Sequence, residues 1–330
     1  MADDEYEETN RAPQGDRHGE GNRAGGHVPV LLKPAIDFLA IKRGGTYIDA
    51  TVGLGGHSFA IASVLGRPGH LIGFDKDQAA LTRAQEGLQA PAECEQDWPA
   101  ITLLHGSFAE VGERLEAATA DGLLADLGVS SMQLEDPARG FSFQAEGPLD
   151  MRMDAQSGMT AEQVVNRLDE RKLADVIYEF GEERRSRRIA RAIVRARPIR
   201  NTAHLAQVVS AAARPMKPAS GAGYGRRGFR SERIDPATRT FQAIRILVNH
   251  ELDDLAGLLE AAPQVLRPGG RLVVISFHSL EDRMVKEALR EGERQKIWRV
   301  LTKKPVTADE QEIALNPRSR SAKMRAAERL

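Results

Sequence analysis

Hydrophobic and polar positions follow two different rhythms along this chain of 330 residues. Short apolar, β-branched runs are separated by segments whose apolar residues recur every three or four positions, the spacing of an amphipathic helix. The runs predict strands at 46–51, 70–75, 101–106, 121–127 and 271–277. The segments between the first four runs predict helices at 57–65, 77–89 and 108–118. This order is typical of an α/β fold with a mostly parallel sheet covered on both faces.

The rhythm changes in the middle of the chain, where 137–236 shows no strand pattern. Helical spacing predicts helices there at 161–166, 173–180, 184–195 and 202–213. We therefore predict an all-helical insertion at 137–236 and a main domain built from 27–136 and 237–330. A long helix at 237–262 leads into the fifth strand, and strands near 297–303 and 321–329 form a closing hairpin.

Composition indicates which part of the chain is disordered and which compartment the protein occupies. Residues 1–26 are polar, charged and rich in glycine, which predicts a disordered tail. Cys94 is the single cysteine, so an internal disulfide is impossible and a reducing cytosol is the expected compartment. No apolar run approaches the ~20 residues needed to cross a bilayer, and the start of the chain does not resemble a signal peptide. We expect a cytoplasmic protein without a membrane partner.

Charge is nearly balanced overall, at −1, but arginines gather in three places. Residues 184–200 hold eight arginines and no acid, 214–233 mix arginine with glycine and aromatics, and 318–325 are basic as well. Each run alone is explained by a solvated helix face or loop. Together they favour a binding partner with a phosphate backbone. The mixture at 214–233 suits single-stranded RNA rather than DNA.

The glycine-rich turn after the first strand carries the main chemical signal. Gly53, Gly55 and Gly56 allow a sharp turn and a close approach of backbone to ligand, and the following helix offers unpaired N–H groups. Asp75 ends the second strand about 20 residues later, where nucleotide-binding α/β units bind ribose hydroxyls. Both NAD and S-adenosylmethionine contain such a ribose. The spacing of the turn differs from the pyrophosphate-binding G-x-G-x-x-G pattern, which favours S-adenosylmethionine.

Two further residues indicate the kind of methyl acceptor. Asp126 ends the fourth strand, beside the crevice where open α/β sheets bind ligands. Methylation of a pyrimidine ring carbon uses a cysteine nucleophile, but Cys94 lies among acidic residues that disfavour a thiolate. A nitrogen or oxygen acceptor therefore remains, attacking the methyl group directly.

Several short motifs stand out between residues 27 and 330. They lie at 27–32, 48–58, 126–131, 139–143, 147–154, 181–184, 188–193, 236–243 and 276–283. Two of them read Ile48-Asp-Ala-Thr-Val-Gly-Leu-Gly-Gly-His-Ser58 and Asp126-Leu-Gly-Val-Ser-Ser131. In this order they closely resemble the bacterial 16S ribosomal RNA cytosine-N4 methyltransferase family.

The resemblance implies a class I, Rossmann-like methyltransferase fold with a helical insertion and S-adenosylmethionine as methyl donor. The implied substrate is the exocyclic N4 amine of a decoding-centre cytosine in 16S ribosomal RNA, within the small subunit. The family's cofactor contacts fall on Gly55, Gly56, His57, Asp75, Phe108, Asp126 and Gln133.

Each candidate also has a plainer interpretation. Asp75 could cap the helix that starts near Asp77, and Phe108 has the spacing of a core residue. Asp126 could hold the methionine amino group of the cofactor instead of the acceptor amine. We interpret Ser130, Ser131, Arg139 and His278 as contacts to the target base or its phosphate, which makes Asp126, Ser130, Ser131 and His278 the catalytic candidates.

The sequence also offers other interpretations of a possible metal site, of the function and of the oligomeric state. Asp150 and Asp154 resemble a pair of metal ligands, but we interpret them as a turn with salt bridges and predict no metal site. A nicotinamide-dependent oxidoreductase and a non-catalytic RNA-binding factor of ribosome assembly are the rival functions. A homodimer is compatible with the sequence.

Overall fold

The computed structural model describes residues 29–156, 158–214 and 235–330. In these residues one sheet of seven strands has the order β3-β2-β1-β4-β5-β7-β6. The strands are β1 (Thr46–Asp49), β2 (His70–Asp75), β3 (Ala100–His105), β4 (Ala120–Asp126), β5 (Leu266–Ser276), β6 (Trp298–Val300) and β7 (Lys323–Arg329). Only β7 runs antiparallel to its two neighbours, β5 and β6. The five predicted parallel strands and the closing hairpin are thus confirmed.

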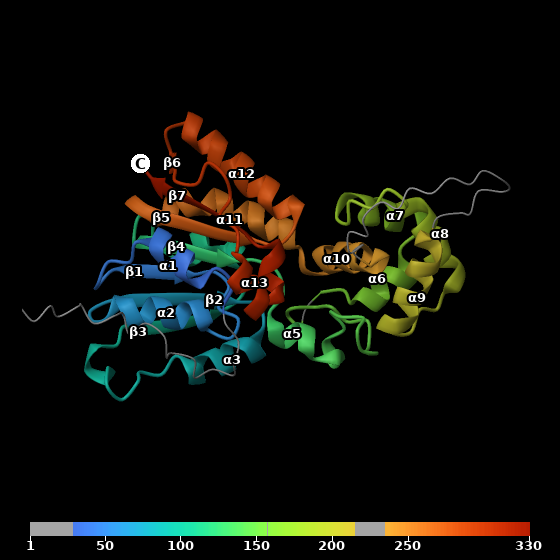
Figure 1. The fold of residues 1–330 in the computed structure, drawn as a ribbon, viewed down its shortest axis with the longest axis horizontal. Coiled ribbons are helices and arrows are strands. Elements are labelled where there is room, and N and C mark those ends of the chain that lie inside the picture. Colours follow the sequence, from blue (N-terminus) through green and yellow to red (C-terminus); the bar gives the residue numbers. More distant parts are fainter. Residues whose placement is uncertain (1–28, 157, 215–234) are drawn as a thin grey trace, which may run out of the picture.

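Helices cover both faces of the sheet. Successive residues of a strand point to opposite faces, so neighbouring residues enter different cores. Ile48 and Leu123 enter one core with residues of α11 and α12, while the adjacent Tyr47 and Leu124 enter another with residues of α1 and α2. Figure 1 shows these helices on the two sides of the sheet. The helices that accompany the sheet are α1 (Leu32–Leu39), α2 (Gly56–Leu65), α3 (Gln78–Gly87), α4 (Val111–Arg114), α5 (Ser131–Glu135), α11 (Glu251–Val265), α12 (Ser279–Arg294) and α13 (Glu310–Leu315). Short 3-10 turns are η1 (Glu95–Asp97), η2 (Phe108–Glu110), η3 (Pro137–Arg139) and η4 (Pro317–Ser321).

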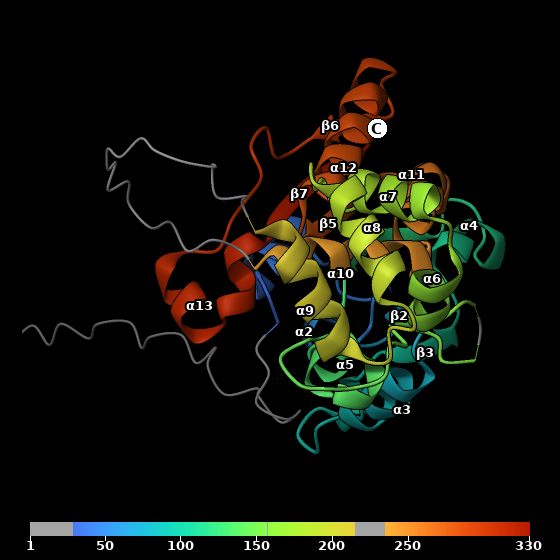
Figure 2. The ribbon, with the colours of Figure 1, turned by 90° about the vertical axis from the view of Figure 1, so that its right-hand side faces the viewer.

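A second body beside the sheet is entirely helical in the described residues (Figures 1 and 2). It contains α6 (Ala161–Arg167), α7 (Glu170–Glu179), α8 (Ser186–Ala196), α9 (Thr202–Ala213) and α10 (Pro236–Asn249). Side-chain caps mark four of the five starts, at Thr160, Asp169, Asn201 and Asp235. The body has its own core, which includes Phe241 and Ile244 of α10. We therefore propose that the insertion extends to the end of α10 instead of ending at residue 236.

The predicted helix at 237–262 is two helices in the structure. His250 adopts a left-handed conformation, with φ 54°, between α10 and α11. The preceding Asn249 donates to the carbonyl of Met151 and accepts from the backbone N–H of Met153. These contacts to a distant loop stabilise a break that helical spacing alone does not reveal.

The predicted helix at 108–118 is also shorter, since η2 and α4 together end at Arg114. Ala118 turns with φ 54°, and the N–H groups of Ala118 and Thr119 donate to carbonyls of α11. Backbone bonding to α11 replaces the last helical turn. The predicted tail at 1–26 and most of the basic loop at 214–233 lie outside the described residues.

Candidate active site

The glycine turn joins β1 to α2 at the carboxyl edge of the sheet. Gly53 and Gly55 have φ values of 52° and 84°, which only glycine adopts readily. In the part of the chain that the structure describes, no heavy atom lies within 4 Å of where a Cβ on Gly53 would stand, so a ligand can approach this backbone closely. Gly56 is needed for a different reason: a Cβ at this position would lie 2.4 Å from Cγ of Pro29. Gly56 therefore makes room for Pro29, and its contact with the cofactor stays a prediction.

Asp75 organises the turn from the end of β2. Its Oδ2 accepts from the backbone N–H of Gly53 at 2.8 Å, and its Oδ1 accepts from the backbone N–H of Asp77 at 2.8 Å. Burial raises the pKa of this carboxyl to about 6, against the lowering effect of the two hydrogen bonds. The side chain that caps α3 is Asp77, which accepts from Ala79. Each Asp75 oxygen keeps a second lone pair for a ribose hydroxyl.

Asp126 stands at the end of β4, next to β1 in the sheet. Its Oδ1 is buried and has no hydrogen-bond partner in the described part of the chain. Its Oδ2 lies 3.6 Å from Nδ1 of His57, whose Nε2 is 3.1 Å from the Val30 carbonyl. Burial, and then the nearby Asp49 carboxylate, raise the pKa of Asp126 to about 8. The Asp126 side chain as a whole is half-buried, and a buried oxygen with no partner on such an acid is the arrangement expected of a group awaiting a ligand or substrate.

The other predicted catalytic residues hold the surrounding backbone. Ser130 caps α5 by accepting from the N–H of Gln133, and the Gln133 side chain accepts in return from the N–H of Ser130. Ser131 is buried and accepts from Arg318. His278 caps α12 with its Nδ1, while its buried Nε2 lacks a well-aligned hydrogen bond and lies 3.1 Å from Oε1 of Glu281.

Two predicted ligand-facing side chains have structural partners. Arg139 was expected to contact base or phosphate, but its guanidinium bonds to Asp77 at 2.7 Å and to the carbonyls of Arg152 and Met153. These bonds use three of its five N–H donors, so Arg139 has a structural role, and its contact with base or phosphate stays a prediction. Asp77 also accepts from the Gln133 side chain at 3.0 Å, so Gln133 bonds to the acid two residues after Asp75.

Phe108, His57 and the C-terminal basic run complete the predicted set. Phe108 follows β3 at the start of η2 and is half-buried against the sheet core. His57 is buried in the first turn of α2. In the C-terminal run, Arg325 is buried in β7 and bonds to Asp282 at 2.7 Å, so it does not form part of a phosphate-binding surface.

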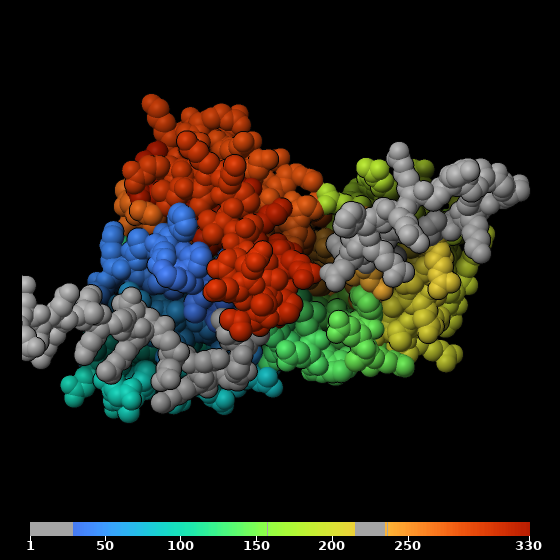
Figure 3. All heavy atoms as spheres, in the orientation of Figure 1, coloured from blue at the N-terminus to red at the C-terminus, as the bar shows by residue number. Residues whose placement is uncertain are grey.

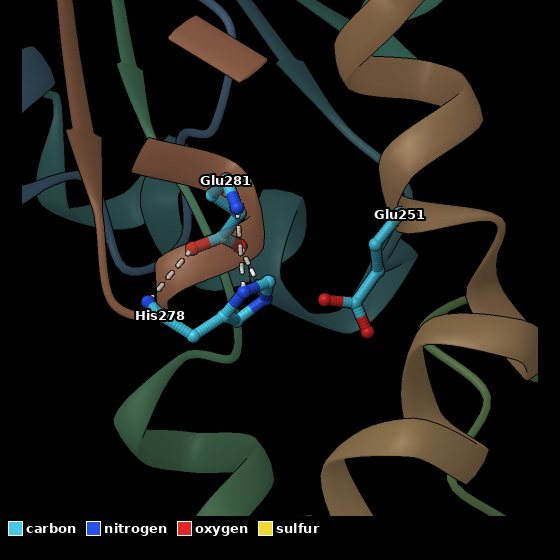
Figure 4. A group of neighbouring side chains, drawn as sticks. All are labelled: Glu251, His278 and Glu281. Carbon is cyan, nitrogen blue, oxygen red and sulfur yellow. Dashed lines mark hydrogen bonds and ion pairs between the residues drawn. The ribbon is translucent and has the colours of Figure 1, made fainter. Parts of the chain in front are cut away.

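Among the described residues, one group of three side chains has the composition of a metal site (Figure 4). Ligand atoms of Glu251, His278 and Glu281 lie within 4.8 Å of one another, a proximity that the sequence did not indicate. Arg245 donates to both oxygens of Glu251 at 2.8 Å, and Glu281 accepts from the backbone N–H groups of Phe277 and His278. Both carboxylates thus have partners, and we interpret the group as an ion-pair network between α10, α11 and α12. The predicted pair Asp150 and Asp154 has its first member bound by Arg152 at 2.8 Å, as a turn with salt bridges requires.

Sequence reasoning missed two residues beside Asp126. Asp49 is completely buried at the end of β1 and accepts from the hydroxyl of Ser58 at 2.6 Å. Arg318, from η4, donates to the carbonyl of Val129 at 2.6 Å, in the loop after β4, and to Ser131, the first residue of α5. The signal that could have found Asp49 is an acid next to the end of the first strand, whereas the basic run at 318–325 gives no sign of the role of Arg318.

The geometry defines the class of protein. A sheet with a reversed seventh strand, a glycine turn after β1 and acids ending β2 and β4 together form a class I S-adenosylmethionine-dependent methyltransferase. The open backbone at Gly53 and the unpartnered oxygen of Asp126 fit this cofactor.

The chain belongs to the MraW methylase family, whose sequence pattern matches residues 24–330. A protein of Koribacter versatilis called Ribosomal RNA small subunit methyltransferase H is 64% identical over 98% of this chain and 99% of its own length. A protein of the same name from Acidobacterium capsulatum is 60% identical over 92% of this chain and 98% of its own. An rRNA methylase structure from Streptococcus thermophilus has a TM-score of 0.39 at 11% identity, covering 92% of this chain and 99% of that one. The family resemblance seen in the sequence is confirmed.

The raised pKa of Asp126 predicts an effect on stability. Because the folded-state pKa of about 8 exceeds the unfolded value of about 3.9, stability from this group is present below pH ~4 and is lost as the pH rises towards 8. The amide of the variant Asp126→Asn imitates the neutral form of the acid. We expect the variant to melt higher than the wild type at pH 8, by ~2 °C or more, and the difference to vanish near pH 4. Calorimetric scans at both pH values test this, and an equal difference at both would contradict it.

Proposed function

We propose that this enzyme transfers the methyl group of S-adenosylmethionine to the exocyclic N4 amine of a decoding-centre cytosine in small-subunit ribosomal RNA. The name shared by the two relatives supports the RNA substrate. The observation that carries the chemistry is Asp126, a half-buried acid at the end of β4 whose buried Oδ1 has no hydrogen-bond partner among the described residues. A ribosomal substrate supports the cytoplasm as the compartment of the reaction. Within the described residues no helix has the length and apolar character of a membrane span.

The proposed chemistry follows from the acceptor. The N4 lone pair of cytosine is delocalised into the ring, so the amine is a weak nucleophile. S-adenosylmethionine supplies a methyl group on a positively charged sulfonium, which needs no activation. The ionised carboxylate of Asp126 accepts a hydrogen bond from the amine, localises its lone pair and receives its proton as the N–CH3 bond forms. The S–CH3 bond breaks at the same time, and the electron pair stays on the sulfur of S-adenosylhomocysteine, a neutral thioether that leaves. The target base must leave its stack to reach this edge of the sheet.

A covalent mechanism would need a cysteine near Asp126 at the carboxyl edge of the sheet, and Cys94 does not lie there. Cys94 is exposed and precedes β3, so it lies towards the amino edge of the parallel strands. Asp126 ends β4 at the carboxyl edge. This separation supports direct attack by an exocyclic nitrogen.

The identity of the product can be tested directly. Purified protein is incubated with cofactor and small-subunit RNA, and the methylated nucleoside is identified by mass spectrometry.

The helical body supplies the proposed RNA contact. On α8 the buried residues Ser186, Ile189, Ala190 and Ile193 face the core. The opposite face is exposed and carries Arg187, Arg188, Arg191 and Arg195, with Arg184 just before the helix. Figure 2 shows α8 at the surface of the helical body. Some arginines of the run are engaged within the protein: Arg185 donates to the Ala213 carbonyl, and Arg197 donates to the Val165 carbonyl at 2.7 Å.

We predict that the RNA affinity falls steeply with salt and that neutralising this face flattens the dependence. The variant replaces Arg184, Arg187, Arg188 and Arg195 with glutamine. Each lost phosphate contact should reduce the slope of log K against log salt by about 0.7 for single strands. The control replaces four exposed basic residues of the sheet body, Arg290, Arg294, Lys296 and Lys304. Equal slopes for the wild type and the α8 variant would make the arginine face a solvated surface only.

A further inference from the structure

The segment that follows α13 fixes one arginine against the active-site loop. Arg318 belongs to η4, where its N–H donates to the Asn316 side chain, and Ser319 is completely buried. Two residues after η4 ends, β7 begins at Lys323 opposite Ser276 of β5. On the other side, Glu312 of α13 accepts from the backbone N–H of Leu31 at 2.6 Å. Figure 3 shows this red segment on the front of the molecule, between the blue and green parts. Its backbone is therefore held at both ends.

The Arg318 guanidinium spans the loop between β4 and α5. One nitrogen, Nη2, donates to the carbonyl of Val129 at 2.6 Å, and the other, Nη1, donates to the hydroxyl of Ser131. Both contacts lie within five residues of Asp126. A planar guanidinium with two parallel donors fixes the direction of its partners more tightly than an ammonium group does.

Arg318 also acts electrostatically on Asp126, because its positive charge is held on the loop that follows this acid. The groups that act on the Asp126 carboxyl come from four elements: Asp49 on β1, His57 on α2, Glu281 on α12 and Arg318 on η4. Asp49 and Glu281 favour its protonated form, while Arg318 favours the carboxylate. Glu135 and Arg245 act in turn on Arg318.

We propose that Arg318 is a positioning residue for methyl transfer: its guanidinium fixes the loop 127–131 beside Asp126 and supplies the positive charge that opposes Asp49 and Glu281 there. This inference rests on the proposed function, in which Asp126 must be ionised to accept the amine proton. Because burial already raises the pKa of Asp126 to about 8, removal of Arg318 should raise it further.

The test compares Arg318→Met, which removes the charge at similar length, with Arg318→Lys, which keeps the charge but not the fork. Lys304→Met is the control, because it removes one exposed charge nearby in the sequence. For Arg318→Met we expect the single-turnover rate at pH 7 to fall about tenfold and the midpoint of its pH profile to rise by about one unit. Towards pH 9 the electrostatic part of this loss should disappear, leaving the pH-independent loss that Arg318→Lys shows, and the affinity for S-adenosylmethionine should change less than about twofold.

For Arg318→Lys we expect the midpoint of the pH profile to stay that of the wild type. The single-turnover rate should be lower at every pH, because lysine holds the loop 127–131 less firmly. An unchanged midpoint in Arg318→Met would overturn the electrostatic role, and a normal rate in both variants would overturn the positioning role. Circular dichroism establishes that each variant is folded, and the lysine variant remains informative if the methionine variant is not.

A second readout needs no RNA. Carbon-13 NMR titration of the Asp126 carboxyl, assigned with Asp126→Asn, should give a higher pKa in Arg318→Met than in the wild type. An equal pKa would contradict the inference. If the wild type fails to form N4-methylcytosine while the NMR shift persists, the proposed function fails and the electrostatic pairing of Arg318 with Asp126 stands.

Discussion

Asp126→Asn is expected to lower the single-turnover methylation rate by about 10²-fold or more, which is the range seen on removal of a general base. The amide keeps the size of the side chain but accepts a proton poorly, so positive charge on the attacking nitrogen is no longer relieved. The measurement is a rapid-quench assay with enzyme, RNA substrate and saturating cofactor. Saturation matters because Asp126 is also a predicted cofactor contact.

Cys94→Ser is the matched control, and its rate should equal that of the wild type. Loss of turnover in Cys94→Ser, or a covalent RNA–protein adduct, would rule out direct attack. A normal rate in Asp126→Asn at saturating cofactor would leave Asp126 as a cofactor ligand only. The acceptor would then have to be sought among Ser130, Ser131 and His278.

Asp75→Ala should weaken S-adenosylmethionine binding about tenfold or more while leaving the protein folded. Hydrogen bonds to a charged group contribute roughly 1.5–3 kcal/mol each, and the variant loses the acceptor for the ribose. It also loses the two bonds that tie Gly53 and Asp77 to this side chain. Isothermal titration calorimetry gives the affinity.

Asp253→Ala is the control for this experiment, because Asp253 is an exposed acid whose side chain is 86% accessible. Its affinity should match that of the wild type. Should Asp75→Ala bind the cofactor normally in a folded state, the ribose contact would have to be assigned elsewhere. The acid would then serve only to shape the glycine turn.

The sheet and the edge that carries the chemistry could be predicted because their signals are local. A buried parallel strand is a short apolar run, and its last residue faces the ligand edge, which placed Asp75 and Asp126 correctly at the ends of β2 and β4. The helices of the insertion were found from apolar spacing alone. Charge gave a weaker signal, since Arg187 of α8 is exposed whereas Arg325 of β7 is buried in an ion pair.

Contacts between distant segments left no such signal. Arg318 reaches Ser131 across 187 residues of sequence, and its run of basic neighbours resembled a surface patch. Asn249 breaks a helix through contacts to a loop near Met151, almost a hundred residues away. Likewise Arg139 looked available for RNA until folding brought it to Asp77. In each case the partner, and not the residue itself, decides the role.

Mass mapping of small-subunit RNA from cells with and without this gene tests the central claim most directly. We predict one decoding-centre cytosine that carries an N4-methyl group only when the gene is present, and that purified protein with S-adenosylmethionine restores it to RNA from the deletion strain. Identical small-subunit RNA in both strains, or a dependent methyl group on a ring carbon, would contradict the account.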